Sequence, residues 1–135
     1  MMKIWRIGTN QRDKDGFGEK QASNFVINQN IVIAWKGLKP NIHKVKKGDL
    51  ILSYHNDNRI IAVGYAVSEI KDHKDSEEQE YFEADWVWKT DESVSNPILR
   101  NEIDMNNARG TVIDMTNGID IAKLLAEIGK RKSNN

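Results

Sequence analysis

The chain contains no cysteine, only two prolines, and no excess of charge of either sign. The absence of cysteine excludes disulfides, thiolate metal ligands and a thiol nucleophile. No stretch is long and apolar enough to cross a bilayer, and residues 1–5 run straight into strand-like sequence, which indicates no signal peptide. We therefore expect a soluble, cytoplasmic protein without a membrane partner.

Twenty basic and twenty acidic side chains give the 135-residue chain a formal net charge of zero. A nucleic-acid binder that relies on bulk attraction is usually more basic. Any nucleic-acid surface here must therefore be a local patch, set against acidic patches elsewhere. The length favours a single domain over residues 1–135, with an ordered core at about 3–129 and a polar tail at 130–135.

Short β-branched or alternating runs predict strands, and turn-forming residues separate them. The clearest pair is 49–54 and 59–69, because His55-Asn56-Asp57-Asn58 between them is typical of a hairpin turn. Gly64 inside the second run suggests a bend or bulge. On 81–89 the residues Phe82, Ala84, Trp86 and Trp88 share one face. Further strands are expected at 3–8, 31–35 and 111–115.

Helical spacing is strongest near the end of the chain, where Ile121, Leu124, Leu125 and Ile128 form an apolar stripe. Thr116 or Asn117 is expected to cap this helix and Gly129 to end it. A short helix is predicted within 19–28 and a helical turn within 97–103, while the charged segment 71–80 reads as a solvated loop. The pattern predicts an α+β protein: a small, strongly bent sheet or open barrel flanked by short helices, with a C-terminal amphipathic helix.

Catalytic and cofactor motifs are scarce. Gly16-Phe17-Gly18 is a G-x-G in a polar loop and is interpreted as turn chemistry, and the three histidines lack paired metal-ligand spacing. We expect no cofactor and no metal. Asp49, with Glu69 and Lys71 in an E-x-K pattern, resembles the metal-binding carboxylates of restriction-type nucleases. Surface charges and a Gly-Asp turn explain the same residues, so the sequence does not favour an enzyme.

Four tryptophans are the most distinctive feature. Trp5 and Trp86 lie in mid-strand among apolar residues and are expected in the core. Trp35 ends a strand before Lys36-Gly37, where a ring can face a cleft and stack on a flat ligand. Trp88, next to Lys89, has the same ambiguity.

Several segments, taken in order, resemble one family. They are K-I-W-R-I-G-T-N at 3–10, I-A-W-K-G at 33–37, K-K-G-D-L-I-L-S-Y-H-N at 46–56, I-I-A-V-G-Y-A-V-S-E at 60–69 and F-E-A-D-W-V-W-K at 82–89. Together they resemble the PUA-like superfamily, in particular EVE and YTH domains and the EVE-like N-terminal modules of McrB-type modification-dependent restriction proteins. The resemblance implies a small bent β-barrel with a pocket for one flipped-out, often methylated base in an aromatic cage.

Transferred by position, the resemblance implies a cage tryptophan at Trp35. It also implies polar contacts to the base from residues at the ends of the first and third strands, and candidate phosphate contacts on basic side chains. The implied base pocket comprises Thr9, Asn10, Trp35, Lys36, Ser53, Tyr54, Asn56 and Trp88, and the implied phosphate contacts are Arg6, Lys89 and Arg109. Lys36 departs from the small polar residue common in YTH domains, which leaves the identity of the base open.

Three functions remain open from the sequence. The favoured one is a reader of modified bases in DNA, with a nuclease or NTPase module on the same or another chain as its partner. An RNA-binding module of the same fold, active in translation or RNA modification, is the alternative. A metal-dependent nuclease using Asp49, Glu69 and Lys71 is the third. An RNA reader is expected to bind more weakly when the substrate loses its 2′-OH, and a DNA reader is not.

Overall fold

The computed structural model describes residues 2–9, 25–35, 42–55, 59–72, 79–90, 96–106 and 112–133. Within them the strands are β1 (Ile4–Gly8), β2 (Ile31–Trp35), β3 (Leu50–His55), β4 (Arg59–Ala66), β5 (Lys71–Asp72), β6 (Gln79–Lys89), β7 (Ile98–Leu99) and β8 (Val112–Asp114). The helical elements are the π-helix η1 (Phe25–Gln29), the 3₁₀-helix η3 (Arg100–Ile103) and the α-helix α3 (Ile121–Ser133). None of the described helices is long and apolar enough to cross a membrane.

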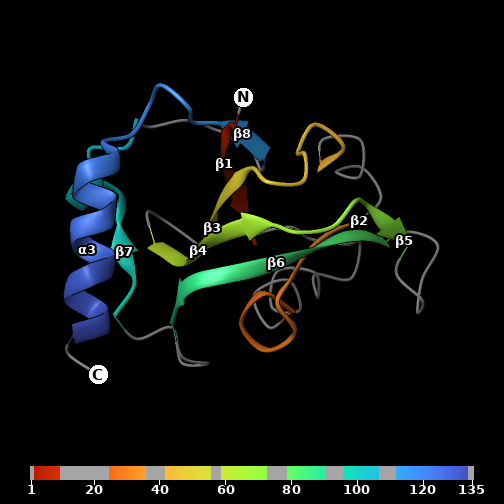
Figure 1. Ribbon diagram of the computed structural model, residues 1–135, viewed down its shortest axis with the longest axis horizontal. Coiled ribbons are helices and arrows are strands. Elements are labelled where there is room, and N and C mark those ends of the chain that lie inside the picture. The colour runs from red at the N-terminus through yellow and green to blue at the C-terminus, as the bar shows by residue number, and fades with distance from the viewer. Residues whose placement is uncertain are drawn as a thin grey trace.

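The strands form one strongly curled sheet in the order β2-β6-β4-β3-β1-β8, with β5 paired to β6 and β7 paired to β4. Only the β1–β3 pair is parallel among these pairings; the rest are antiparallel. Helix α3 and β7 lie at one end of the curl, and η1 lies beside β6 (Figure 1). The expected bent α+β sheet with a C-terminal helix is therefore confirmed.

Two apolar clusters cover opposite faces of the central strands. Ile4 of β1 and Leu52 of β3 belong to the cluster that includes Leu124 of α3. Trp5 and Ile7 of β1 belong to a second cluster with Phe82 of β6. Because alternate residues of a strand point to opposite faces, every residue of β1 is buried. Trp5 is a core residue, as its sequence context predicted.

The β3–β4 hairpin was correctly predicted, and Gly64 explains how β4 and β6 pair closely. A Cβ placed on Gly64 would lie 2.0 Å from the carbonyl oxygen of Asp85. The pairing of β4 with β6 shifts register between Val63 and Gly64, so the expected irregularity is a bulge. Only glycine leaves room for the β6 backbone at this point.

The C-terminal helix differs from its prediction at both ends. Its first turn is capped by Asp120, whose Oδ1 accepts a hydrogen bond from the Lys123 N–H (3.1 Å), rather than by Thr116 or Asn117. The helix also runs past Gly129 to Ser133. Arg131 explains this extension: its guanidinium donates to the carbonyl oxygen of Pro97 at 2.8 Å and pairs with Glu127. Residues 130–133 are therefore part of the helix and not a frayed tail.

Two loop predictions also change. Within the segment expected to be a solvated loop, Lys71–Asp72 pair with β6 as the short strand β5, and Gln79 and Glu80 begin β6. Of the helix expected at 19–28, the described part is the π-helix η1, which extends to Gln29. The turn expected at 97–103 is present as β7 followed by η3.

Candidate functional site

The ends of β1 and β3 bring two predicted pocket residues together. Thr9 directly follows β1, and Ser53 lies in β3, which runs parallel to β1. Both line a narrow gap whose other walls are mainly apolar and come from β1, β2 and η1. The pairing of β3 with β4 shifts register between Ser53 and Tyr54, which places a bulge beside this gap. Bulges of this kind re-aim side chains next to functional sites.

Thr9 is held in place by its own hydrogen bonds. Its N–H donates to the carbonyl oxygen of Tyr54 at 2.7 Å. Its hydroxyl donates to the same oxygen at 3.1 Å and shares a hydrogen bond with Nδ1 of His55 at 2.8 Å. The imidazole of His55 thus contacts a residue that lines the gap, although the sequence assigned His55 to a turn and the structure makes it the last residue of β3. A loop histidine next to a strand end carries no distinguishing signal in the sequence.

The gap is small in this structure. None of it is wide enough to admit a water molecule. Thr9 and Ser53 are only 2% and 1% exposed. A nucleobase therefore enters only if the walls of the gap move apart.

Several predicted site residues lie outside the described residues. These are Asn10, Lys36, Asn56 and the predicted phosphate contact Arg109. Trp35 ends β2, and its backbone pairs with Gln79 of β6, but its side chain is not among those described. Its role as the stacking ring remains a prediction.

Two predicted contacts are corrected because their side chains pack elsewhere and do not line the gap. Trp88 is only 7% exposed and belongs to the apolar cluster that faces α3, where the guanidinium of Arg131 lies 5.9 Å from the ring centroid. Arg6 is 5% exposed, and its guanidinium stacks over the ring of Tyr54 at 4.3 Å. Burial lowers the pKa of Arg6 below its ordinary value. We remove Trp88 from the base pocket and Arg6 from the phosphate contacts.

Lys89 and Trp86 both hold η1 against β6. The ammonium of Lys89 donates to the carbonyl oxygen of Ile27 at 2.6 Å and to Oδ1 of Asn30 at 3.3 Å. The indole N–H of Trp86 donates to the carbonyl oxygen of Val26 at 2.9 Å. The half-buried Trp86 is therefore structural, as expected, and Lys89 is a structural contact in addition to any role towards a phosphate.

The nuclease-like residues do not share a common site. The carboxylate of Asp49 accepts hydrogen bonds from the N–H groups of Lys3 and Lys46 and from the indole of Trp5. Lys71 instead pairs with Glu83 at 3.3 Å. Among the residues that the structure describes, no group of three or more His, Cys, Asp or Glu side chains is arranged to hold a metal ion.

Sequence reasoning missed a second hollow that the described residues form. It has a volume of about 570 Å³ and lies where the chain enters β1 and β3. Lys3, Lys44, Lys46 and Lys47 line it, together with Met2 and Asp49. The Lys44-Val45-Lys46-Lys47 run was the visible signal for a local basic patch in a chain of zero net charge.

No known protein family and no curated protein matches the sequence. Among solved structures, the chain is similar to a protein from Leishmania major that is described only as hypothetical. The two share 14% sequence identity over 98% of each chain, with a TM-score of 0.55. At this identity the similarity concerns the fold alone.

Proposed function

We propose that the chain is a nucleic-acid-binding module that takes a single unstacked base into the gap between β1, β2 and β3, with modified DNA as the favoured substrate. The observation that carries the proposal is the meeting of Thr9 and Ser53 at one gap. The family resemblance implied both residues as part of one base pocket, although they are more than forty residues apart in the sequence. The strand β2, which ends at Trp35, contributes Val32 and Ile33 to the same gap.

The chemistry of the gap suits a base with an added methyl group. Its walls are mainly apolar, with Ile7, Val26 and Ile33 among them, and Thr9 and Ser53 are the residues with hydroxyl groups that line it. Burial of one methyl group contributes about 0.8 kcal/mol. Stacking on an aromatic ring contributes about 1–3 kcal/mol per base, which offsets the few kcal/mol lost when a base leaves its stack.

Because the gap is closed to water, base binding requires a widening that the free protein does not show. We infer that this widening displaces η1, a five-residue π-helix that contributes Val26 to the gap. We therefore expect base binding to weaken the contacts of η1 with Trp86 and Lys89. A recognition module of this kind would serve a nuclease or NTPase module on the same or another chain.

A binding panel at fixed salt tests the proposal. It compares DNA and RNA oligonucleotides of one sequence with and without base methylation, because affinities depend strongly on ionic strength. Trp35→Ala is expected to abolish binding with the thermal melt nearly unchanged, whereas Trp35→Phe keeps a stacking ring and most of the affinity. If Trp35→Ala unfolds the protein, the ring belongs to the core and the pocket assignment is wrong. Equal affinity for all oligonucleotides at low salt also contradicts base recognition.

The same panel distinguishes DNA from RNA. An RNA reader loses affinity when the 2′-OH is removed, and a DNA reader does not. If the protein prefers the RNA oligonucleotides, its substrate is RNA and not modified DNA, and the assignment of the base to the gap is unchanged.

A further inference from the structure

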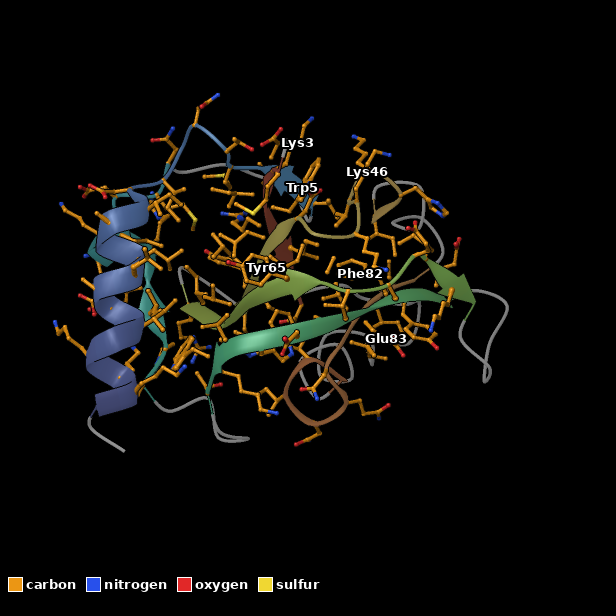
Figure 2. The ribbon with its side chains drawn as sticks, in the orientation of Figure 1. Lys3, Trp5, Lys46, Tyr65, Phe82 and Glu83 are labelled. Carbon is orange, nitrogen blue, oxygen red and sulfur yellow. The ribbon has the colours of Figure 1, made fainter. Side chains whose placement is uncertain are left out.

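The lysine-lined hollow lies at the opposite end of β1 and β3 from the base gap. Lys3 precedes β1, and Lys44, Lys46 and Lys47 precede β3, whereas Thr9 follows β1. Lys3 and Lys46 both project from the same upper edge of the molecule (Figure 2). Six residue-to-residue steps of extended chain lead from Lys3 to Thr9, which corresponds to about 20 Å. The hollow is thus a second site and not an extension of the gap.

The backbone around the hollow is fixed by Asp49. One carboxylate oxygen accepts the Lys3 N–H at 3.1 Å, and the other accepts the Lys46 N–H at 2.9 Å. The Gly48 N–H donates to the carbonyl oxygen of Ala66 at 2.7 Å, and Gly48 adopts a positive φ of 95°. Val45, between the lysines, is buried in the core. The loop therefore holds its lysine side chains around one concave surface before any ligand arrives.

The positive charge of the hollow is poorly neutralised. Lys44, Lys46 and Lys47 make no ion pair with any residue that the structure describes. By contrast, the exposed lysines Lys71 and Lys123 each pair with a carboxylate. Lys3 lies 3.7 Å from a carboxylate oxygen of Asp114, in a pair that is about half exposed on each side. The one carboxylate that lines the hollow, Asp49, is only 5% exposed and is already engaged by three N–H donors.

We propose that this hollow binds closely spaced phosphate groups, which are those of a nucleic-acid backbone if the proposed function holds. The binding of phosphate groups does not depend on that function; only their assignment to a nucleic-acid backbone does. Flexible lysine ammonium groups act as point charges and suit phosphate groups spread along a strand. A concave wall of one charge sign concentrates oppositely charged ligands. Since one DNA strand carries a phosphate for every ~3.4 Å of helix axis, a duplex that lies along β1 with one base in the gap would bring phosphates roughly six nucleotides away to the hollow.

The test compares two triple variants with the same change in charge. K44Q/K46Q/K47Q neutralises the hollow, and K123Q/K130Q/K132Q neutralises three exposed lysines of α3 as the matched control. Binding to a duplex of about 20 base pairs is measured over a range of salt concentrations. We expect the slope of log affinity against log salt to fall by about 2–3 in the hollow variant and by less than 1 in the control. At 0.1 M salt the affinity of the hollow variant then falls roughly 100-fold, with its preference between methylated and unmethylated probes unchanged.

The indole N–H of Trp5 provides an independent NMR readout because it is bonded to Asp49 on the wall of the hollow. Addition of inorganic tripolyphosphate is expected to shift this resonance and the amide resonances of residues 44–49 in the wild type, but not in K44Q/K46Q/K47Q. Such shifts without any binding of oligonucleotides would support the phosphate site and contradict the proposed function. The phosphate site would be overturned if both triple variants lowered the slope of log affinity against log salt equally, or if tripolyphosphate shifted none of these resonances. Base recognition would then still be decided by the Trp35→Ala experiment.

Discussion

The indole N–H of Trp5 donates to a carboxylate oxygen of Asp49 across 2.8 Å, and the two side chains are only 4% and 5% exposed. This bond joins β1 to the turn before β3. The same carboxylate caps that turn by accepting the Lys46 N–H. A hydrogen bond to a buried charged group contributes about 1.5–3 kcal/mol. We expect Asp49→Asn to lower the free energy of unfolding by about 2–3 kcal/mol.

A double-mutant cycle measured by urea unfolding tests the bond directly. Trp5→Phe and Asp49→Asn should show a coupling energy of about 1 kcal/mol. Strictly additive effects of the two substitutions would contradict the bond.

The contribution of Asp49 should depend on pH. Burial alone would raise the pKa of its carboxyl, but the N–H groups of Lys46, Lys3 and Trp5 outweigh burial and hold the pKa below its ordinary value. A depressed carboxyl pKa stabilises the fold above the unfolded pKa of about 4, and this stabilisation is lost as the pH falls through the lower folded value. The difference in unfolding free energy between wild type and Asp49→Asn should therefore be constant from about pH 5 to 7 and shrink below pH 4. A difference that grows on acidification would refute this account.

Gly64 and Gly129 provide a matched pair of glycine substitutions. A methyl group on Gly64 would meet the backbone of β6, so we expect Gly64→Ala to destabilise the protein by about 3 kcal/mol or to prevent folding. Gly129 lies inside α3 with no heavy atom within 4 Å of an added Cβ. Gly129→Ala should therefore stabilise by about 0.5–1 kcal/mol. Thermal melts of the two variants check both signs; a stable Gly64→Ala protein would mean that β4 and β6 are farther apart.

Local patterns predicted the strands better than the helix ends. The β3–β4 hairpin followed from the turn residues at 55–58, and the buried face of β6 followed from the alternation of Phe82 and Ala84. The end of α3 could not be predicted, because Gly129 is a usual stop signal and the contacts that extend the helix join Arg131 to residues more than thirty positions away. Contacts that distant leave no mark in a local pattern.

Arg131 should anchor the last turn of α3. Its guanidinium bonds to Asn96, Pro97 and Glu127 and stacks near Trp88 while remaining only 8% exposed. Arg131→Met removes these bonds and leaves buried acceptors without a partner, so we expect a loss of about 2–3 kcal/mol. Lys132→Met, on the adjacent exposed position, should change stability by less than about 0.5 kcal/mol. Equal effects in chemical denaturation would show that Arg131 does not anchor the helix.

The site was less predictable than the fold. The family resemblance implied that Thr9 and Ser53 lie near one another, and both line the same gap. It assigned Arg6 and Trp88 to the ligand, since a basic or aromatic side chain in a strand carries no sign of the face to which it points. Both faces of β1 proved to be buried, which placed Arg6 inside. The lysine hollow arises from segments that only the parallel pairing of β1 with β3 brings together.

Substitution of Lys89 can distinguish a structural role of its side chain from a contact with phosphate. Its ammonium already bonds to the carbonyl oxygen of Ile27 and to Asn30, which ties the end of η1 to β6. Lys89→Gln should therefore lower the unfolding free energy by about 1 kcal/mol and increase amide hydrogen exchange in residues 25–29. It should leave the salt dependence of oligonucleotide binding within experimental error of the wild type, whereas a phosphate contact would reduce the slope by about 1. A reduced slope would show that Lys89 also contacts a phosphate, as the family resemblance implies.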